Sequence, residues 1–144
     1  MNHFVEIPMR ILDIEGDGFH LMIEGKINGK DAHFLIDTGA SRSVFDPNTI
    51  ATFIEDPQFV KKEGITAGVG SSQLESSTFC IASLCLGELE IRNYQGIALD
   101  LEAIHESYAK IKLPMIHGII GGDILARHKA IINYRMKKIK LKRR

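Results

Sequence analysis

The pattern with the clearest chemical potential in this chain of 144 residues is the triplet Asp37-Thr38-Gly39, which follows the apolar run Phe34–Ile36. An aspartate that ends an apolar strand in a tight turn is expected to be partly desolvated, which favours its protonated form. A carboxyl group that can hold or release a proton is suited to general acid–base catalysis. The same residues also fit an Asx-type turn that only closes a hairpin, as many proteins have.

A second segment, HGIIGGDILARH from His117 to His128, reads as an apolar strand, two glycines and a short helix. The two segments together resemble the retropepsin-like aspartic protease family, and the second is most similar to its cellular and bacterial members. That family has an apolar-apolar-Asp-Thr/Ser-Gly-Ala motif followed later by an apolar-apolar-Gly segment that packs beneath it. Here these are Leu35–Ala40 and Ile119–Gly121.

The resemblance covers nearly the whole chain and implies a fold and an activity. The implied fold is all-β: a closed retropepsin-like barrel with one or two short helices and one lobe per chain. The implied activity is that of an aspartic endopeptidase acting on peptides or proteins without a metal or cofactor. The resemblance assigns catalysis to Asp37, Thr38 and Gly39, and substrate contacts to Ala40, Ser41, Val44, Gly68, Val69, Gly70, Ile119 and Ile120.

Retropepsins close over their substrate with a glycine-rich hairpin, called the flap, and the candidate here is Gly64–Gly70. Glycine at a hairpin tip permits hinge motion and close contact with a peptide backbone. An ordinary surface turn would have the same composition. Both readings remain open at this stage.

The chain has a single Asp-Thr-Gly, although the reaction uses two carboxyl groups that share one proton. The other aspartates are not followed by Thr-Gly or Ser-Gly, and the chain is too short to hold a duplicated lobe. The second carboxyl group must therefore come from Asp37 of another copy, so we expect a homodimer. The resemblance implies that Thr38 of each copy braces the pair across the two-fold axis. Viral members have an ion pair at the positions of Ser41 and Gly122 that this chain lacks.

Short alternating segments must position these residues. We expect strands over Phe4–Ile14, Phe19–Ile27, Ala32–Ile36, Ser43–Phe45, Ser76–Leu86, Leu89–Leu99, His117–Gly121, Ala130–Tyr134 and Lys138–Leu141. Asn28-Gly29 predicts a two-residue hairpin turn with positive φ at both positions. Asp46 and Pro47 begin a short helix that we expect to reach Phe53. Periodicity leaves Asp100–Lys112 open between a helix and an irregular segment.

Composition is that of one soluble domain spanning residues 1–144, with 44% hydrophobic and 25% charged residues. Lys plus Arg and Asp plus Glu both count 18, so the net charge gives no general attraction to nucleic acid or to anionic membranes. Two cysteines are too few for a secreted disulfide framework, and neither a signal peptide nor a membrane-spanning run is evident. The expected location is the cytoplasm, with no nucleic-acid or membrane partner.

Two further signals are weaker. The six histidines show no metal-binding spacing and are expected to be ordinary surface or core residues. The basic tail Arg135–Arg144 could contact nucleic acid or acidic lipid, but its alternation is more typical of a strand with one solvated face.

Three functions therefore remain to be separated. The leading hypothesis is a homodimeric aspartic endopeptidase that binds extended peptides. The second is a retropepsin-fold peptide-binding or dimerisation module without turnover, although such a module has no chemical reason to keep an intact Asp-Thr-Gly. The third, a nucleic-acid binder using the basic tail, has the least support.

Overall fold

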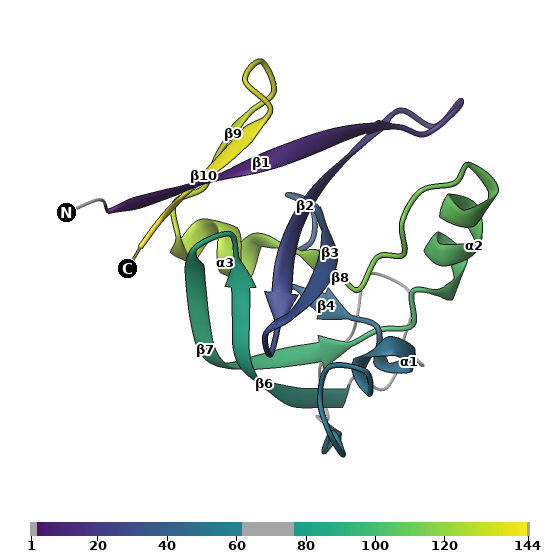
Figure 1. The fold of residues 1–144 in the computed structure, drawn as a ribbon, viewed down its shortest axis with the longest axis vertical. Helices are drawn as coiled ribbons and strands as arrows, with labels where there is room; N and C mark the ends of the chain where they lie inside the picture. The colour runs from purple at the N-terminus through teal and green to yellow at the C-terminus, as the bar shows by residue number, and fades with distance from the viewer. Residues whose placement is uncertain (1–2, 62–76, 144) are drawn as a thin grey trace.

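The computed structural model describes residues 3–61 and 77–143, and in this part the fold is mainly β, as the sequence predicts (Figure 1). The strands are β1 (Phe4–Asp13), β2 (Phe19–Ile27), β3 (Lys30–Ile36), β4 (Val44–Phe45), β5 (Val60–Lys61), β6 (Ser77–Leu86), β7 (Leu89–Ala98), β8 (Gly118–Ile120), β9 (Ile131–Asn133) and β10 (Lys138–Lys142), and the helices are α1 (Pro47–Ile50), α2 (Glu102–Lys110) and α3 (Gly122–Arg127). The candidate flap Gly64–Gly70 lies outside the described residues.

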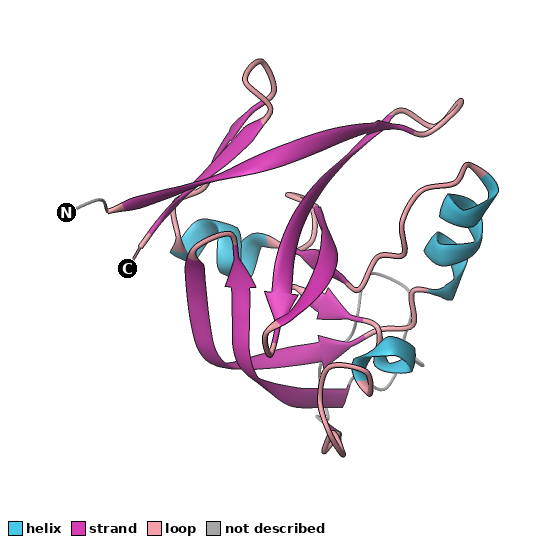
Figure 2. Cartoon of the chain, viewed as in Figure 1, coloured by secondary structure: helices cyan, strands magenta, loops and turns pink. Residues whose placement is uncertain are grey.

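Strand pairing closes a barrel. The strands β2, β3, β8, β4, β7 and β6 are hydrogen-bonded in that order, and β6 pairs back onto β2 (Figure 2). Closure brings β2 against β6 at Gly25, where an added Cβ would lie 2.2 Å from the backbone oxygen of Cys85. Only glycine fits such a close crossing of two backbones. The closed barrel that the resemblance implies is therefore confirmed.

The hairpin joining β2 and β3 sets the register of the strand that carries Asp37. Asn28 and Gly29 have φ angles of 50° and 83°, as the type of turn predicted from the sequence requires. The two strands then pair from Ile27 opposite Lys30 to Leu21 opposite Ile36. A short turn thus fixes which residues of β3 face each side of the sheet.

β3 is buried on both faces. Phe34 and Ile36 belong to the barrel core, where Phe34 meets Phe45 edge to face at 6.2 Å between ring centroids. Leu35 points to the other side, into a second cluster between the barrel and α2. We call this second group the outer cluster; its buried members are Leu12, Met22, Leu35, Leu101, Tyr108 and Ile116. Burial on both faces holds β3 rigidly, and with it the residue at its end.

An arm extends the sheet beyond the barrel. The second half of β1 pairs with β2, and its first half pairs with β10, which carries β9 at the edge. Figure 1 shows β1 and the β9–β10 hairpin beside the barrel, with both ends of the chain on the same side. Lys138, Lys140 and Lys142 therefore belong to a strand with buried Ile139 and Leu141, as the alternation favours.

The helices differ from expectation in number and length. The described chain has three helices rather than one or two, because Asp100–Lys112, which periodicity left open, contains α2. Leu101, Ile104 and Tyr108 face the outer cluster from this segment, so tertiary contact decides its conformation. α1 begins as predicted, with Asp46 accepting from the backbone N–H of Asn48, but it ends at Ile50. None of the described helices is long and apolar enough to cross a membrane.

His117, which directly precedes β8, sits in a partly buried position. Its Nδ1 accepts a hydrogen bond from the backbone N–H of His33 at 3.0 Å, and its ring meets Phe53 edge-on. Burial, together with the neighbouring His33 and His105, lowers the pKa of His117, and Asp46 opposes this only weakly. The unfolded chain therefore takes up a proton at this residue more readily than the folded one.

We predict that the protein loses stability as the pH falls below about 6.5, the ordinary pKa of histidine, because the folded state favours neutral His117. The urea midpoint should be lower at about pH 5 than at about pH 7.5. This difference should shrink in His117→Asn, whose amide oxygen can accept the same bond without titrating. His3→Asn, at an exposed histidine, is the control. A pH dependence of stability in His117→Asn that equals that of wild type would contradict the role given to His117.

Candidate active site

The candidate catalytic residue, Asp37, directly follows β3 at the point where that strand meets β8. β3 and β8 run parallel, with Ile36 opposite Ile120, and the backbone N–H of Asp37 donates to the oxygen of Ile120 at 3.0 Å. β4 pairs with the other edge of β8, so the chain passes around β8 between β3 and β4. The two sequence motifs are therefore direct neighbours in the fold.

The turn after β3 gives the Asp37 carboxyl group a defined orientation. Its Oδ1 accepts from the backbone N–H of Gly39 at 2.9 Å, and its backbone oxygen accepts from Ala40 N–H at 3.2 Å. The side chain itself is exposed, so the partial desolvation expected from the sequence is wrong for a single chain. The apolar strand ends before Asp37, and the turn lies on the surface.

Gly39 matters for the space that it leaves beside Asp37. It is not among the residues of the described chain that have positive φ, so the turn does not need its unusual backbone freedom. An added Cβ would instead lie 3.3 Å from Oδ1 of Asp37. Glycine at this position therefore leaves room for the carboxyl group beside the backbone N–H that orients it.

The turn rests on the beginning of α3. The first backbone N–H groups of a helix have no partner within the helix. Here the N–H of Gly122 donates to the oxygen of Ala40 at 2.7 Å, and that of Asp123 donates to the oxygen of Ser41 at 3.1 Å. The approach is so close that a Cβ on Gly121 would lie 2.7 Å from the oxygen of Ala40. The glycines of the second motif thus let the helix support the turn.

A polar network beneath the turn joins three elements. Ser43, which is fully buried, donates from its N–H and its Oγ to Oδ1 of Asp123, at 2.9 and 2.7 Å. The Oγ of Ser43 accepts in turn from the N–H of Gly121 at 2.9 Å. The hydroxyl of Tyr94 donates to Oδ2 of Asp123. Burial, followed by this hydrogen bond to a carboxylate, raises the pKa of Tyr94 well above its ordinary value.

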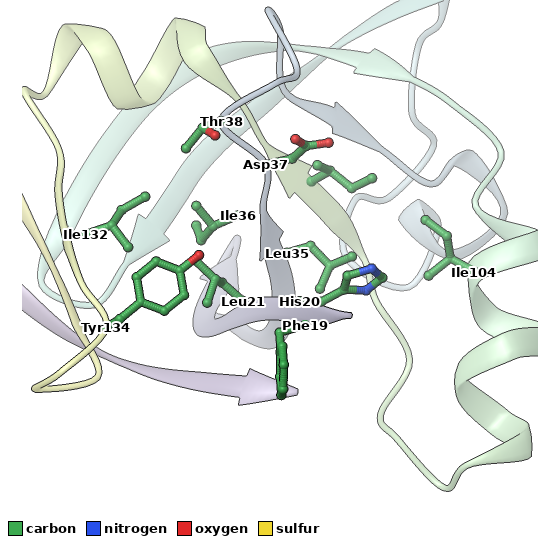
Figure 3. Close-up of a pocket in the computed structure, with 11 residues that line it drawn as sticks. Phe19, His20, Leu21, Leu35, Ile36, Asp37, Thr38, Ile104, Ile132 and Tyr134 are labelled. Atoms are coloured by element: carbon green, nitrogen blue, oxygen red, sulfur yellow. The ribbon is translucent and has the colours of Figure 1, made fainter. Parts of the chain in front are cut away.

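A pocket of about 500 Å³ opens beside the Asp37 carboxyl group (Figure 3). We call it the Asp37 pocket; it is lined by Phe19, His20, Leu21, Leu35, Ile36, Asp37, Thr38, Ile104, Ile119, Ile132 and Tyr134. In Figure 3, Ile132 and Tyr134 from the β9–β10 hairpin lie on one side, and His20 and Ile104 lie on the other. A pocket that combines apolar side chains with a few polar groups is the usual form of a substrate site.

The substrate-contact residues predicted from the sequence do not all lie at the Asp37 pocket. Ile119 lines the Asp37 pocket, whereas the side chain of Ile120 is fully buried in the barrel core and does not reach it. Val44 packs against the outer cluster. Ala40 and Ser41 do not line the pocket either, and their backbone oxygens face α3. Gly68, Val69 and Gly70 lie outside the described residues.

Several pocket residues carried no signal in the sequence. Phe19 and His20 begin β2, Ile104 lies on α2, and Ile132 and Tyr134 come from the β9–β10 hairpin. Their convergence depends on how distant segments pack, which no local pattern reveals. Asp123 lies in the second motif, HGIIGGDILARH, but that motif gave no indication of its bonds to Ser43 and Tyr94.

Metal ligands do not gather in the part of the chain that the structure describes, where no group of three or more His, Cys, Asp or Glu side chains could hold an ion.

Known proteins share the sequence pattern and the fold of this chain. The sequence model described as "Aspartyl protease" matches residues 23–124. A retropepsin-like aspartic protease from Rickettsia conorii has a similar structure, with a TM-score of 0.58, 17% identity and coverage of 96% of this chain and 89% of that one. The retroviral protease-like domain of Ddi1 from Leishmania major follows, with a TM-score of 0.53, 16% identity and coverage of 85% and 87%. No curated protein matches.

We predict that the Asp123 network stabilises the turn at Asp37. Asp123→Ala leaves the buried N–H and hydroxyl of Ser43 and the hydroxyl of Tyr94 without their acceptor, which should cost roughly 2–4 kcal/mol. Tyr94→Phe removes only one of these bonds and should cost about 1 kcal/mol. Urea unfolding of both variants measures the two losses. Equal losses would show that Ser43 does not depend on Asp123.

Proposed function

The chain belongs to the aspartyl protease family, and from that premise we propose that it is an aspartic endopeptidase whose active site forms between two copies of Asp37. One observation carries the proposal: an exposed carboxyl group, oriented by Gly39 N–H at the end of a rigid strand, lies at the edge of a pocket that apolar and polar side chains line together.

The need for two copies follows from the chemistry. Hydrolysis of a peptide bond by this class requires one carboxylate to take a proton from water and one carboxylic acid to donate a proton to the scissile carbonyl oxygen. Within residues 3–61 and 77–143, the Asp37 pocket contains no second carboxyl group. A two-fold axis next to Asp37 supplies one from an identical position.

Surface features around Asp37 support such an axis. Phe19 and Tyr134 line the same pocket, and their side chains are 66% and 59% exposed. Large exposed aromatic groups are typical of surfaces that a partner covers. The Thr38 hydroxyl has no hydrogen-bond partner within the described chain, so it is available to bond across the axis. A second copy would also remove Asp37 from bulk water.

In the proposed mechanism, the two carboxyl groups share one proton because two like charges so close together cannot both be ionised. The ionised group removes a proton from the water held between them, and the resulting hydroxide attacks the scissile carbonyl carbon. The other group donates its proton to the carbonyl oxygen. Breakdown of the tetrahedral intermediate then transfers a proton to the leaving amine, and no covalent enzyme intermediate forms.

The decisive substitution is Asp37→Asn, which keeps the shape of the side chain but removes its ability to exchange a proton. We predict that cleavage of a peptide library falls by roughly a thousandfold. Asp31→Asn, an exposed aspartate at the other end of the same strand, is the matched control. Cleavage that persists in Asp37→Asn rules out this mechanism. Absence of cleavage by the wild-type chain would favour a peptide-binding module instead.

The proposed active site forms only when two subunits associate. Specific activity should fall on dilution as dimers dissociate, and sedimentation measured over the same concentrations should show the matching loss of dimer. Excess Asp37→Asn chain should inhibit the wild-type enzyme, because mixed dimers hold only one carboxyl group. Constant specific activity in a preparation that sediments as a monomer would contradict the shared site.

A further inference from the structure

His20 is a pocket residue to which the mechanism assigns no role. It lies at the start of β2, opposite Leu12 of β1, and lines the Asp37 pocket together with Ile104 of α2. Apart from Asp37, Thr38 and Tyr134, the other lining residues are apolar. The imidazole is thus the one nitrogen-bearing side chain that the described residues bring to this wall of the pocket.

Tyr108 fixes the position of the His20 imidazole ring. Its hydroxyl lies 2.6 Å from Nδ1 of His20, and the two rings are stacked with centroids 5.9 Å apart. Tyr108 itself is only 2% exposed and belongs to the outer cluster. Since the outer cluster fixes α2 against the barrel, it also fixes the orientation of the His20 ring.

The hydrogen bond sets the tautomer of His20. Burial raises the pKa of Tyr108 to about 12, so its hydroxyl keeps its hydrogen at neutral pH. A buried hydroxyl hydrogen needs an acceptor, and within the described chain His20 Nδ1 is the partner that the Tyr108 hydroxyl has. Tyr108 therefore donates and Nδ1 accepts, which places the hydrogen of the neutral imidazole on Nε2. The result is a fixed N–H donor in an apolar wall.

We propose that His20 is a specificity-determining residue of the endopeptidase, and that it selects a substrate side chain with an apolar stem and an uncharged acceptor oxygen at its tip. Glutamine is the amino acid that matches this description best. The proposal rests on the proposed function, because it concerns the pocket beside Asp37 as the place where a substrate side chain binds.

Charge and hydrogen bonding together give the preference. An aliphatic side chain in this pocket would leave the Nε2–H without a partner, and an unpaired buried donor costs more than a neutral hydrogen bond gains. A site built to donate to a substrate atom therefore discriminates against analogues that lack this atom. Glutamate has the acceptor, but its charge would lie near the negative charge that the Asp37 pair carries. The amide oxygen of glutamine avoids that repulsion.

The test uses fluorogenic peptides that differ only in one residue next to the scissile bond: glutamine, glutamate or norleucine. On the side of the bond that the Asp37 pocket accepts, wild type should cleave the glutamine peptide about tenfold better than the norleucine peptide, measured as the ratio of kcat/KM. The ratio should fall to about one in His20→Leu. His20→Gln, which retains an N–H donor, should restore part of it. His3→Leu, which changes a histidine outside the pocket, is the control.

Tyr108→Phe is the second variant, since it keeps the buried ring and removes only the hydroxyl. It should lower the glutamine-to-norleucine ratio about threefold, because Nδ1 is no longer held as an acceptor. The ¹⁵N chemical shifts of His20 should show the Nε2–H tautomer in wild type and a mixture of tautomers in Tyr108→Phe. These shifts report the assignment even where His20→Leu fails to fold.

The outcomes separate the two proposals. No cleavage of any peptide by wild type overturns both of them. Cleavage that depends on Asp37, combined with a wild-type ratio near one or with a ratio unchanged in His20→Leu, overturns the role of His20 alone. Preference for glutamate over glutamine would show a protonated imidazole and would overturn the tautomer that Tyr108 is argued to impose.

Discussion

The site depends on one structural constraint, which is that β8 lies between the two strands on either side of the Asp37 turn. β3 pairs with one edge of β8 and β4 pairs with the other, so residues 37–43 must cross over the end of β8. The crossing leaves almost no space, which explains glycine at position 121, whose neighbours are backbone oxygens of the turn. Backbone contacts of this kind fix a turn more firmly than side chains do, because they cannot relax by changing rotamer.

The same constraint supports the proposal that two copies of the chain form the active site. α3 and the Ser43–Asp123 pair support one side of the turn. Asp37 therefore lies on the other side, at the surface. Within a single subunit the Asp37 carboxyl group is then exposed to solvent. In the proposed enzyme, a partner surface supplies both the second carboxyl group and the exclusion of water that makes two carboxyl groups share a proton. In the proposed dimer, each chain supplies one rigid half of the active site.

Features of the fold that neighbouring residues determine could be predicted from the sequence. Features that depend on contacts between distant segments could not. Asn28-Gly29 predicts its turn because the φ requirement lies in the two residues themselves. The proximity of Asp37 to Ile120 followed from family resemblance. Exposure of Asp37 could not be predicted, because burial depends on what covers the turn. Nor could α2, whose helical form depends on contacts of Leu101 and Tyr108 with residues far away in the chain. The same holds for the pocket, which five separate segments of the chain build.

α2 suggests how chemistry and selectivity are separated in this fold. The elements beneath Asp37 are parts of the barrel and of α3, and in the proposed enzyme a change in them would disturb catalysis on every substrate. α2 contacts the pocket only from the side, through Ile104 and through the bond between Tyr108 and His20. It lies in a segment that no strong local signal forces into a helix, and it packs on the outer cluster rather than in the barrel core. Substitutions there can alter the pocket wall while the turn at Asp37 keeps its supports, so selectivity can change without loss of the catalytic geometry.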